Sequence, residues 1–173
     1  MKIMEKREEF IITRIFNAPR ELVWRAWTEP RDLQQWWGPT GFKIRVYKFD
    51  LKPGGVFHYC MLAEDAPDMW GKFVYREINA PERLVYVNSF ADKEGNVIRP
   101  PFDQNWPKEI LNSVTLSEHG KKTKLTLRSW PVSATDEERK TFVDNFDSMN
   151  QGFGGTFDQL DLHLRNYIDG IKT

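Results

Sequence analysis

The sequence predicts an α+β fold in which a curved antiparallel sheet of about seven strands wraps around a long C-terminal helix, with two short helices after the first strand. Three observations lead to this prediction. The middle of the chain holds β-rich segments joined by turns, its end carries a helical stripe of large apolar residues, and 14% of the residues are aromatic. Strands followed by a helix are typical of proteins whose sheet and helices form separate layers. We expect one domain over residues 1–173, since a chain of this length can bury its own core.

The first strand and two short helices are expected near the start of the chain. Phe, Ile and Thr are frequent in Glu8–Phe16, which favours a strand. Pro19 suits the first turn of a helix, and Arg20–Trp27 then carries apolar residues at helical spacing. A second short helix is expected to begin at Pro30 and to end at Trp36–Trp37, where a Gly-Pro pair follows.

Six further strands are expected between residues 42 and 130, where β-branched and aromatic residues are frequent. Their ranges are Phe42–Leu51, Val56–Leu62, Trp70–Ile78, Arg83–Phe90, Glu109–Glu118 and Lys121–Trp130. Most connections are short turns, apart from a loop at Glu64–Asp68, so the strands are expected to form one antiparallel meander. The long exception, Ala91–Lys108, spans about 18 residues and is either a binding loop or a solvated insertion.

The end of the chain is expected to be helical. Thr135 and Glu138 have the spacing of a capping box, which marks a helix start. Large apolar residues then recur every three or four positions over residues 142–168. A separate turn is expected around Asp144, and Gly170 is expected to cap the end of the helix.

A single long helix against a curved sheet leaves a space that ring side chains either fill or line. Three glycines in the helical stripe, Gly152, Gly154 and Gly155, indicate a bend or a close approach of another segment, and they reduce the filling of that space. We expect a pocket for a small ligand there, the alternative being a solid core. The apolar residues expected around it are Phe57, Tyr59, Met61, Trp70, Phe73, Trp106, Trp130, Met149, Phe153 and Phe157. Asn112, Arg128 and Glu109 are the expected polar contacts, although Arg128 also suits a solvated strand position.

Composition excludes several classes of protein. Twenty-five basic and 25 acidic residues give a formal net charge of zero, which argues against nucleic-acid binding. No apolar run approaches the roughly 20 residues of a membrane-spanning helix, so no membrane partner is expected. The only cysteine, Cys60, cannot form an internal disulfide, which favours a reducing compartment and a cytoplasmic location.

The sequence contains no recognised catalytic or metal-binding motif. His58, His119 and His163 do not have the spacing of zinc ligands, so no metal site is expected. Cys60 has no neighbouring base that would activate it as a nucleophile. Nucleophile-elbow, phosphate-loop and dinucleotide-binding motifs are also missing, and we therefore predict no catalytic residue and no cofactor.

A resemblance to a known family covers nearly the whole chain. The run RIFNAPRELVWRAWTEPRDLQQWWGP at Arg14–Pro39 resembles the opening signature of the Hsp90-ATPase-activator-homologue family, which belongs to the START-like, or Bet v 1-like, helix-grip superfamily. Asp50–Phe57, Trp70–Phe73, Gln151–Phe153 and Leu160–Leu164 resemble its later motifs. The resemblance implies the helix-grip fold and the binding of a hydrophobic ligand. Members are often dimers, so it also implies a homodimer.

Three functions remain open at this point. The first is a binding protein that holds a small hydrophobic molecule in the cavity. The second is an enzyme, such as a cyclase or hydro-lyase, which would need an ionisable group with a shifted pKa inside the same cavity. The third is a protein that binds a chaperone, a function that the family's founding co-chaperone suggests. Such a function requires an exposed apolar patch.

Overall fold

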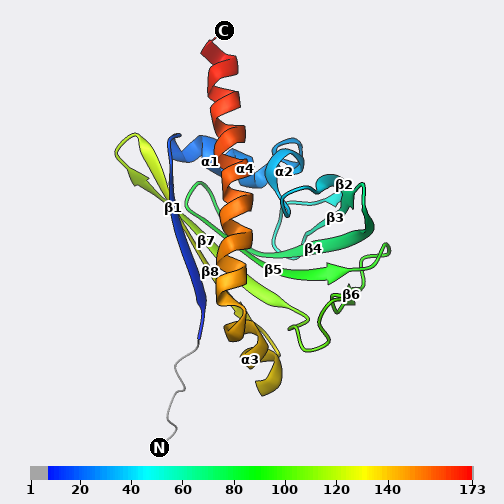
Figure 1. Ribbon diagram of the computed structural model, residues 1–173. Helices are drawn as coiled ribbons and strands as arrows, with labels where there is room; N and C mark the ends of the chain where they lie inside the picture. The colour runs from blue at the N-terminus through cyan, green and yellow to red at the C-terminus, as the bar shows by residue number, and fades with distance from the viewer. Residues whose placement is uncertain (1–7, 173) are drawn as a thin grey trace, which may run out of the picture.

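The computed structural model describes residues 8–172 and contains the expected mixture of helices and one sheet. Its elements are β1 (Phe10–Phe16), α1 (Arg20–Thr28), α2 (Pro30–Trp36), β2 (Lys43–Phe49), β3 (Val56–Ala63), β4 (Ala66–Asn79), β5 (Arg83–Ala91), β6 (Val97–Ile98), β7 (Ile110–His119), β8 (Lys122–Pro131), α3 (Asp136–Asp144) and α4 (Phe146–Lys172). Figure 1 shows α4 running along one face of the sheet. The predicted α+β helix-grip architecture is confirmed.

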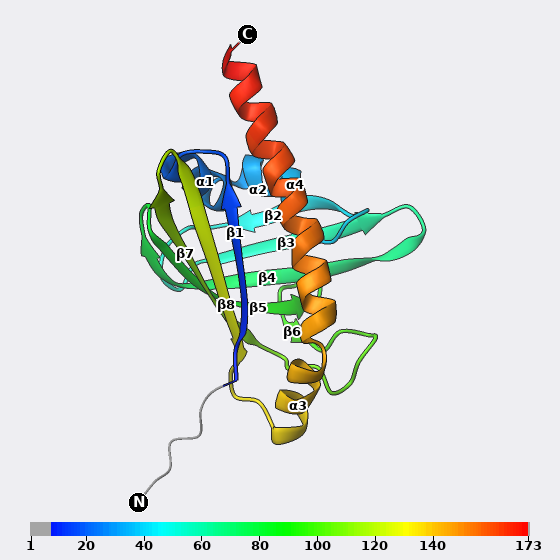
Figure 2. The same cartoon turned by 60° about the vertical axis from the view of Figure 1, so that its left-hand side comes forward.

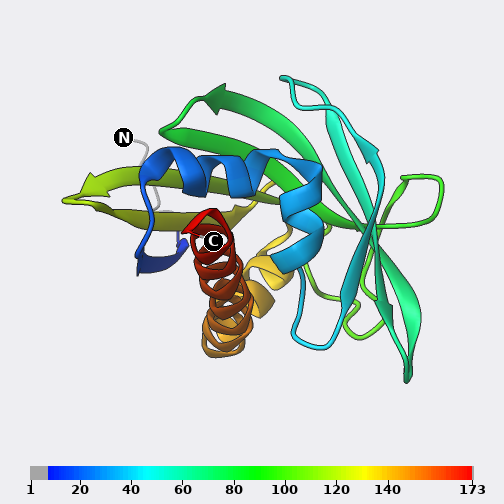
Figure 3. The ribbon, with the colours of Figure 1, turned by 90° about the horizontal axis from the view of Figure 1, so that it is seen from above.

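Within the described residues the strands form one eight-stranded antiparallel sheet. Its order is β1-β8-β7-β5-β4-β3-β2, and β6 pairs with the end of β5. The prediction of a simple meander is therefore wrong for β1, which pairs with β8 and not with β2. The cause is visible in Figures 1 and 3, where α1 and α2 carry the chain across one end of the sheet before β2 begins.

The sheet curves around α4, as the view along the helix in Figure 3 and the side view in Figure 2 show. The apolar stripe of α4 faces the sheet, and Phe157, Leu160 and Leu164 are almost fully buried. These side chains join strand residues from both halves of the sheet in one hydrophobic core. Burial of this stripe is what holds a 27-residue helix in place.

The predicted start of the helical region is confirmed, and the predicted end is wrong. The Thr135 hydroxyl accepts from the Glu138 amide at 3.1 Å, and the Glu138 carboxylate accepts from the Thr135 amide at 3.1 Å. A break at Asn145 separates α3 from α4, as expected around Asp144. Gly170 does not cap α4, because the helix continues to Lys172.

Two expectations about the loops also change. The predicted loop at Glu64–Asp68 is mostly strand, because β4 begins at Ala66. Pro67 is tolerated there because it lies opposite a register shift between Met61 and Ala63, where the ladder is irregular. The long connection after β5 contains the short strand β6, which raises the number of strands above the expected seven.

The close approach that the helix glycines predict is found at Gly155. A β-carbon at this position would lie 2.8 Å from Oγ1 of Thr40, in the segment after α2. The adjacent Thr156 hydroxyl donates to the Gly38 carbonyl at 2.9 Å, and this bond fixes α4 against the same segment. Gly152 and Gly154 have open space where a β-carbon would stand.

Candidate functional site

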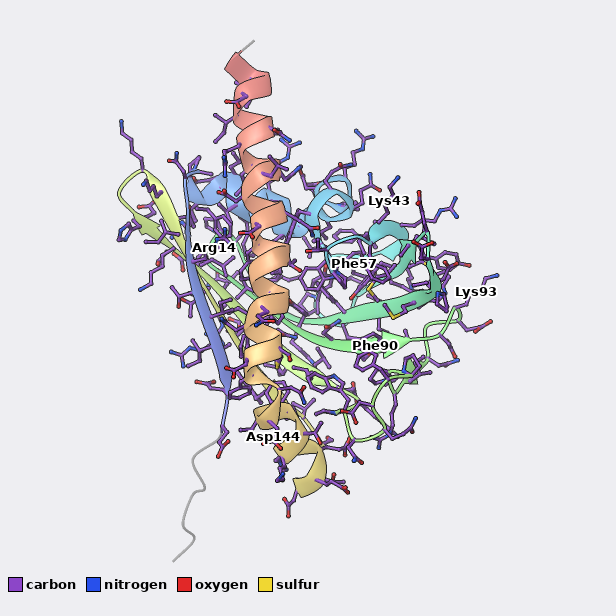
Figure 4. The ribbon with its side chains drawn as sticks, viewed as in Figure 1. Arg14, Lys43, Phe57, Phe90, Lys93 and Asp144 are labelled. Atoms are coloured by element: carbon purple, nitrogen blue, oxygen red, sulfur yellow. The ribbon has the colours of Figure 1, made fainter. Side chains whose placement is uncertain are left out.

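A cavity of about 240 Å³ lies between α4 and the β3–β5 part of the sheet and is partly open to solvent. The segment after α2 and the end of the long connection complete its wall. Most of the lining is apolar, which is typical of sites for small hydrophobic molecules. Figure 4 shows the side chains that crowd the region beside α4 and over the sheet, with Phe57 among them.

Five of the residues expected around the pocket line this cavity. Tyr59 and Met61 come from β3, where they alternate with outward-facing residues. Trp106 comes from the long connection, and Met149 and Phe153 come from the first turns of α4. The structure thus brings together side chains from three distant parts of the chain.

Four expected residues lie beside the cavity and not on its wall. Phe57, Phe73 and Phe157 have no exposed surface and pack in the core, where Phe57 and Phe73 meet edge to face at 5.1 Å. Asn112 is also buried, and its polar atoms are engaged within the sheet. Its amide donates to the Ile110 carbonyl at 3.2 Å and its oxygen accepts from the Ser129 hydroxyl at 2.5 Å.

Trp70, Arg128 and Trp130 differ most from the expectation, because they do not lie on the cavity side of the sheet. Along β4 the buried residues Gly71 and Phe73 face α4, so Trp70 faces the other way and packs on the ring of His58 at 4.9 Å. Arg128 is half exposed and forms an ion pair with Glu9 at 2.7 Å. Trp130 follows the same alternation along β8 as Arg128 and does not line the cavity.

Twelve lining residues were not among those expected around the pocket: Trp37, Gly38, Pro39, Gly71, Asn88, Ser89, Phe90, Pro107, Lys108, Ile110, Gly152 and Thr156. Asn88 offered a signal, since it is a polar residue in the core-facing row of β5 that also includes Tyr86 and Phe90. Gly152 offered another, as one of the three helix glycines that the sequence analysis connects with unfilled space. Gly71 matters because a β-carbon there would lie 2.6 Å from Cζ and Oη of Tyr59.

The hydroxyl of Tyr59 forms the polar centre of the cavity wall. It accepts a hydrogen bond from Nδ2 of Asn88 at 3.3 Å, and the Trp37 ring packs edge to face on the Tyr59 ring at 6.5 Å. Burial raises the pKa of Tyr59, so the phenol stays neutral at physiological pH. The same Asn88 nitrogen donates to the Lys72 carbonyl at 3.0 Å, which fixes the orientation of the amide.

The charge on the cavity wall comes from a single exposed lysine. Of the residues that line the cavity within the described chain, Lys108 is the one basic residue, and no Asp, Glu or His accompanies it. No group of three His, Cys, Asp or Glu side chains that could hold a metal ion occurs among residues 8–172. The arrangement therefore suits binding through shape and hydrogen bonds better than acid–base chemistry.

The long connection is part of the cavity wall and is held by one arginine. The Arg99 guanidinium donates to the carbonyls of Gln104 at 2.7 Å and Trp106 at 3.3 Å, and to the Glu138 carboxylate at 3.2 Å. Trp106 also packs against Phe142 of α3 at 5.8 Å. These contacts favour the binding-loop interpretation of this segment over a solvated insertion.

Comparisons with known proteins agree with this architecture. A protein from Staphylococcus epidermidis is 26% identical, covers 96% of this chain and 95% of its own, and has a TM-score of 0.75. A protein from Mycobacterium smegmatis is 27% identical over 90% of both chains, with a TM-score of 0.72. A protein from Arthrobacter aurescens is 26% identical over 91% of this chain and 86% of its own, with a TM-score of 0.76.

No curated protein is significantly similar to the chain. Within the part of the chain that the structure describes, no helix is long and apolar enough to cross a membrane. The family model described as "Activator of Hsp90 ATPase homolog 1-like protein" matches residues 17–165, which include the cavity and most of both layers. The chain therefore belongs to the Activator of Hsp90 ATPase homolog 1-like family.

Proposed function

We propose that the protein binds a small hydrophobic molecule in the cavity between the sheet and α4. The observation that carries this proposal is the cavity itself, which has a largely apolar wall and lies beside a tightly packed aromatic core. An apolar cavity of roughly 150 Å³ holds benzene. On that scale, the volume of about 240 Å³ holds roughly ten non-hydrogen atoms.

Two glycines support the proposal because each keeps part of this space open. Gly152 leaves α4 bare at the cavity wall, where a longer side chain would occupy the space. Gly71 lets the Tyr59 ring lie against β4 and not project further into the cavity. Larger residues at these positions would be expected if the interior simply had to be filled.

A function as a chaperone partner is a second candidate, which the description of the family model suggests. Large apolar side chains are exposed on β1, at Ile11 and Ile15, and on the long connection, at Ile98 and Phe102. They are available to a protein partner or to a second copy of the chain.

An enzymatic function has less support, because the wall of the cavity lacks a paired acid and base.

The proposal is tested with naphthalene, a two-ring hydrocarbon of suitable volume, and a matched pair of variants. Gly152→Leu places a side chain into the cavity, whereas Gly154→Leu adds the same side chain on α4 away from the lining. Both positions have open space and both gain helix propensity, so neither variant should lose its fold.

Titration followed by amide NMR shifts should detect binding by the wild type and by Gly154→Leu. The Gly152→Leu variant should bind at least about tenfold more weakly, a difference of about 1.4 kcal/mol. Absence of binding by the wild type, or equal binding by both variants, would contradict the proposed site.

A further inference from the structure

We infer that the ligand presents an uncharged oxygen acceptor, such as the carbonyl of an aromatic ketone or aldehyde, to the hydroxyl proton of Tyr59. This inference rests on the proposed function, because it identifies the ligand class of the same cavity. It follows from the hydrogen bonds of one buried side chain.

The Tyr59 oxygen already serves as a hydrogen-bond acceptor, because Nδ2 of Asn88 donates to it at 3.3 Å. A phenol also has one proton of its own to donate. The residues that the structure describes show no acceptor for that proton. A ligand in the cavity can supply it.

The orientation of Asn88 excludes the simplest alternative, in which its amide is turned and its oxygen takes the Tyr59 proton. The Asn88 atom that contacts Tyr59 at 3.3 Å also lies 3.0 Å from the Lys72 carbonyl oxygen. A carbonyl oxygen only accepts hydrogen bonds, so that atom has to be the amide nitrogen. Asn88 is consequently a donor to Tyr59.

The free proton belongs to a hydroxyl on the cavity wall. Tyr59 lines the cavity but is only 3% exposed, so bulk water reaches it poorly. Its ring lies over Gly71, where a β-carbon would be 2.6 Å from Oη. A buried donor without a partner is destabilising, and a ligand acceptor at this point would remove that penalty.

The acceptor is uncharged because the surroundings cannot compensate for an anion. The lining cation, Lys108, is exposed, whereas Tyr59 is buried among aromatic rings such as Trp37 and Phe73. Transfer of a carboxylate from water into such a site carries a large desolvation penalty. A carbonyl group loses much less hydration and still accepts the phenol proton.

The test compares acetophenone with α-methylstyrene, in which a methylene group replaces the carbonyl oxygen at nearly the same shape. Dissociation constants for both are measured by NMR titration of the wild type, Tyr59→Phe and Tyr75→Phe. Tyr75 is the matched control, because its hydroxyl is also buried in the core but does not line the cavity.

The preference for acetophenone over α-methylstyrene should fall about three- to tenfold in Tyr59→Phe and stay unchanged in Tyr75→Phe. If both compounds bind and their ratio is the same in the wild type and Tyr59→Phe, the inference is wrong while the proposed function stands. An equal fall in both variants would also overturn it, since the effect would not depend on the cavity wall. If neither compound binds the wild type, the inference fails, and the naphthalene titration decides separately whether the proposed function also fails.

Discussion

Nε2 of His163 in α4 lies 2.8 Å from Oδ1 of Asp32 in α2, and this hydrogen bond joins the far half of the long helix to the short helices. The other Asp32 oxygen is 3.5 Å from Nε of Arg25. Arg25 in turn donates to the Tyr167 hydroxyl at 2.9 Å. Asp32 is only 8% exposed, so its carboxylate has lost most of its hydration. These partners stabilise the buried carboxylate.

Replacement of Asp32 by Ala should lower the free energy of unfolding by roughly 2 kcal/mol, because it removes an acceptor from two buried or half-buried donors. Urea denaturation with an unchanged m-value measures this loss. The control is Glu77→Ala, which breaks the half-exposed pair with Arg83 and should cost at most about 1 kcal/mol. Equal losses in the two variants would show that Asp32 has no special structural role.

Gly71→Ala should destabilise the protein by about 1–3 kcal/mol, since the added methyl group overlaps the ring of Tyr59. Thermal unfolding followed by circular dichroism measures the change. Gly152→Ala is the control, because its methyl group meets open space and the helix gains up to about 1 kcal/mol. A rise in melting temperature for both variants would contradict the contact.

Gly155→Ala should gain less stability than Gly152→Ala, although both lie in α4. The reason is the Thr40 hydroxyl, which would lie 2.8 Å from the new β-carbon. Removal of that hydroxyl in a Thr40→Ala background should restore the full helix gain of about 1 kcal/mol. A double-mutant cycle by urea denaturation measures this coupling, and a coupling of zero would refute it.

Glu138 should make stability depend on pH in the acid range. Hydrogen bonding from the Thr135 backbone, with Arg99 adding to it, lowers the pKa of this carboxyl below its usual value of 4.5. A lowered folded-state pKa stabilises the protein fully above about pH 4.5, and the contribution is lost as pH falls through the folded-state value.

The variant Glu138→Gln should therefore be less stable than the wild type by about 1 kcal/mol at pH 7. The difference should shrink as pH falls below 4.5, which urea denaturation at a series of pH values would detect. Glu137→Gln serves as the control, because Glu137 lies in the same helical turn but is exposed. If the difference in free energy of unfolding between the wild type and Glu138→Gln stayed constant down to pH 3, these contacts would not lower the pKa of Glu138.

Local patterns were enough to predict most of the fold. The spacing of Phe157, Leu160 and Leu164 identified the buried face of α4, and Thr135 with Glu138 identified the start of α3. Such signals depend on residues close together in the chain, so the sequence carries them directly.

The site was harder to predict because it depends on which face of each strand meets α4. Trp70 was expected in the cavity, but the outer face of the sheet is also aromatic there, with Tyr47 and His58 beside it. Ring content alone therefore did not separate the two faces. The contact of Arg99 with Glu138 joins residues 39 positions apart, and no local pattern encodes such a pair.

The hydrogen bonds of Arg99 connect the stability of the cavity wall with that of α3. The same guanidinium holds the backbone of Trp106, on the cavity wall, and the carboxylate that closes the first turn of α3. We therefore expect fraying of that turn to be coupled to loosening of the cavity wall. A ligand that contacts the Trp106 indole should slow amide hydrogen exchange at the beginning of α3, although the ligand itself does not contact α3.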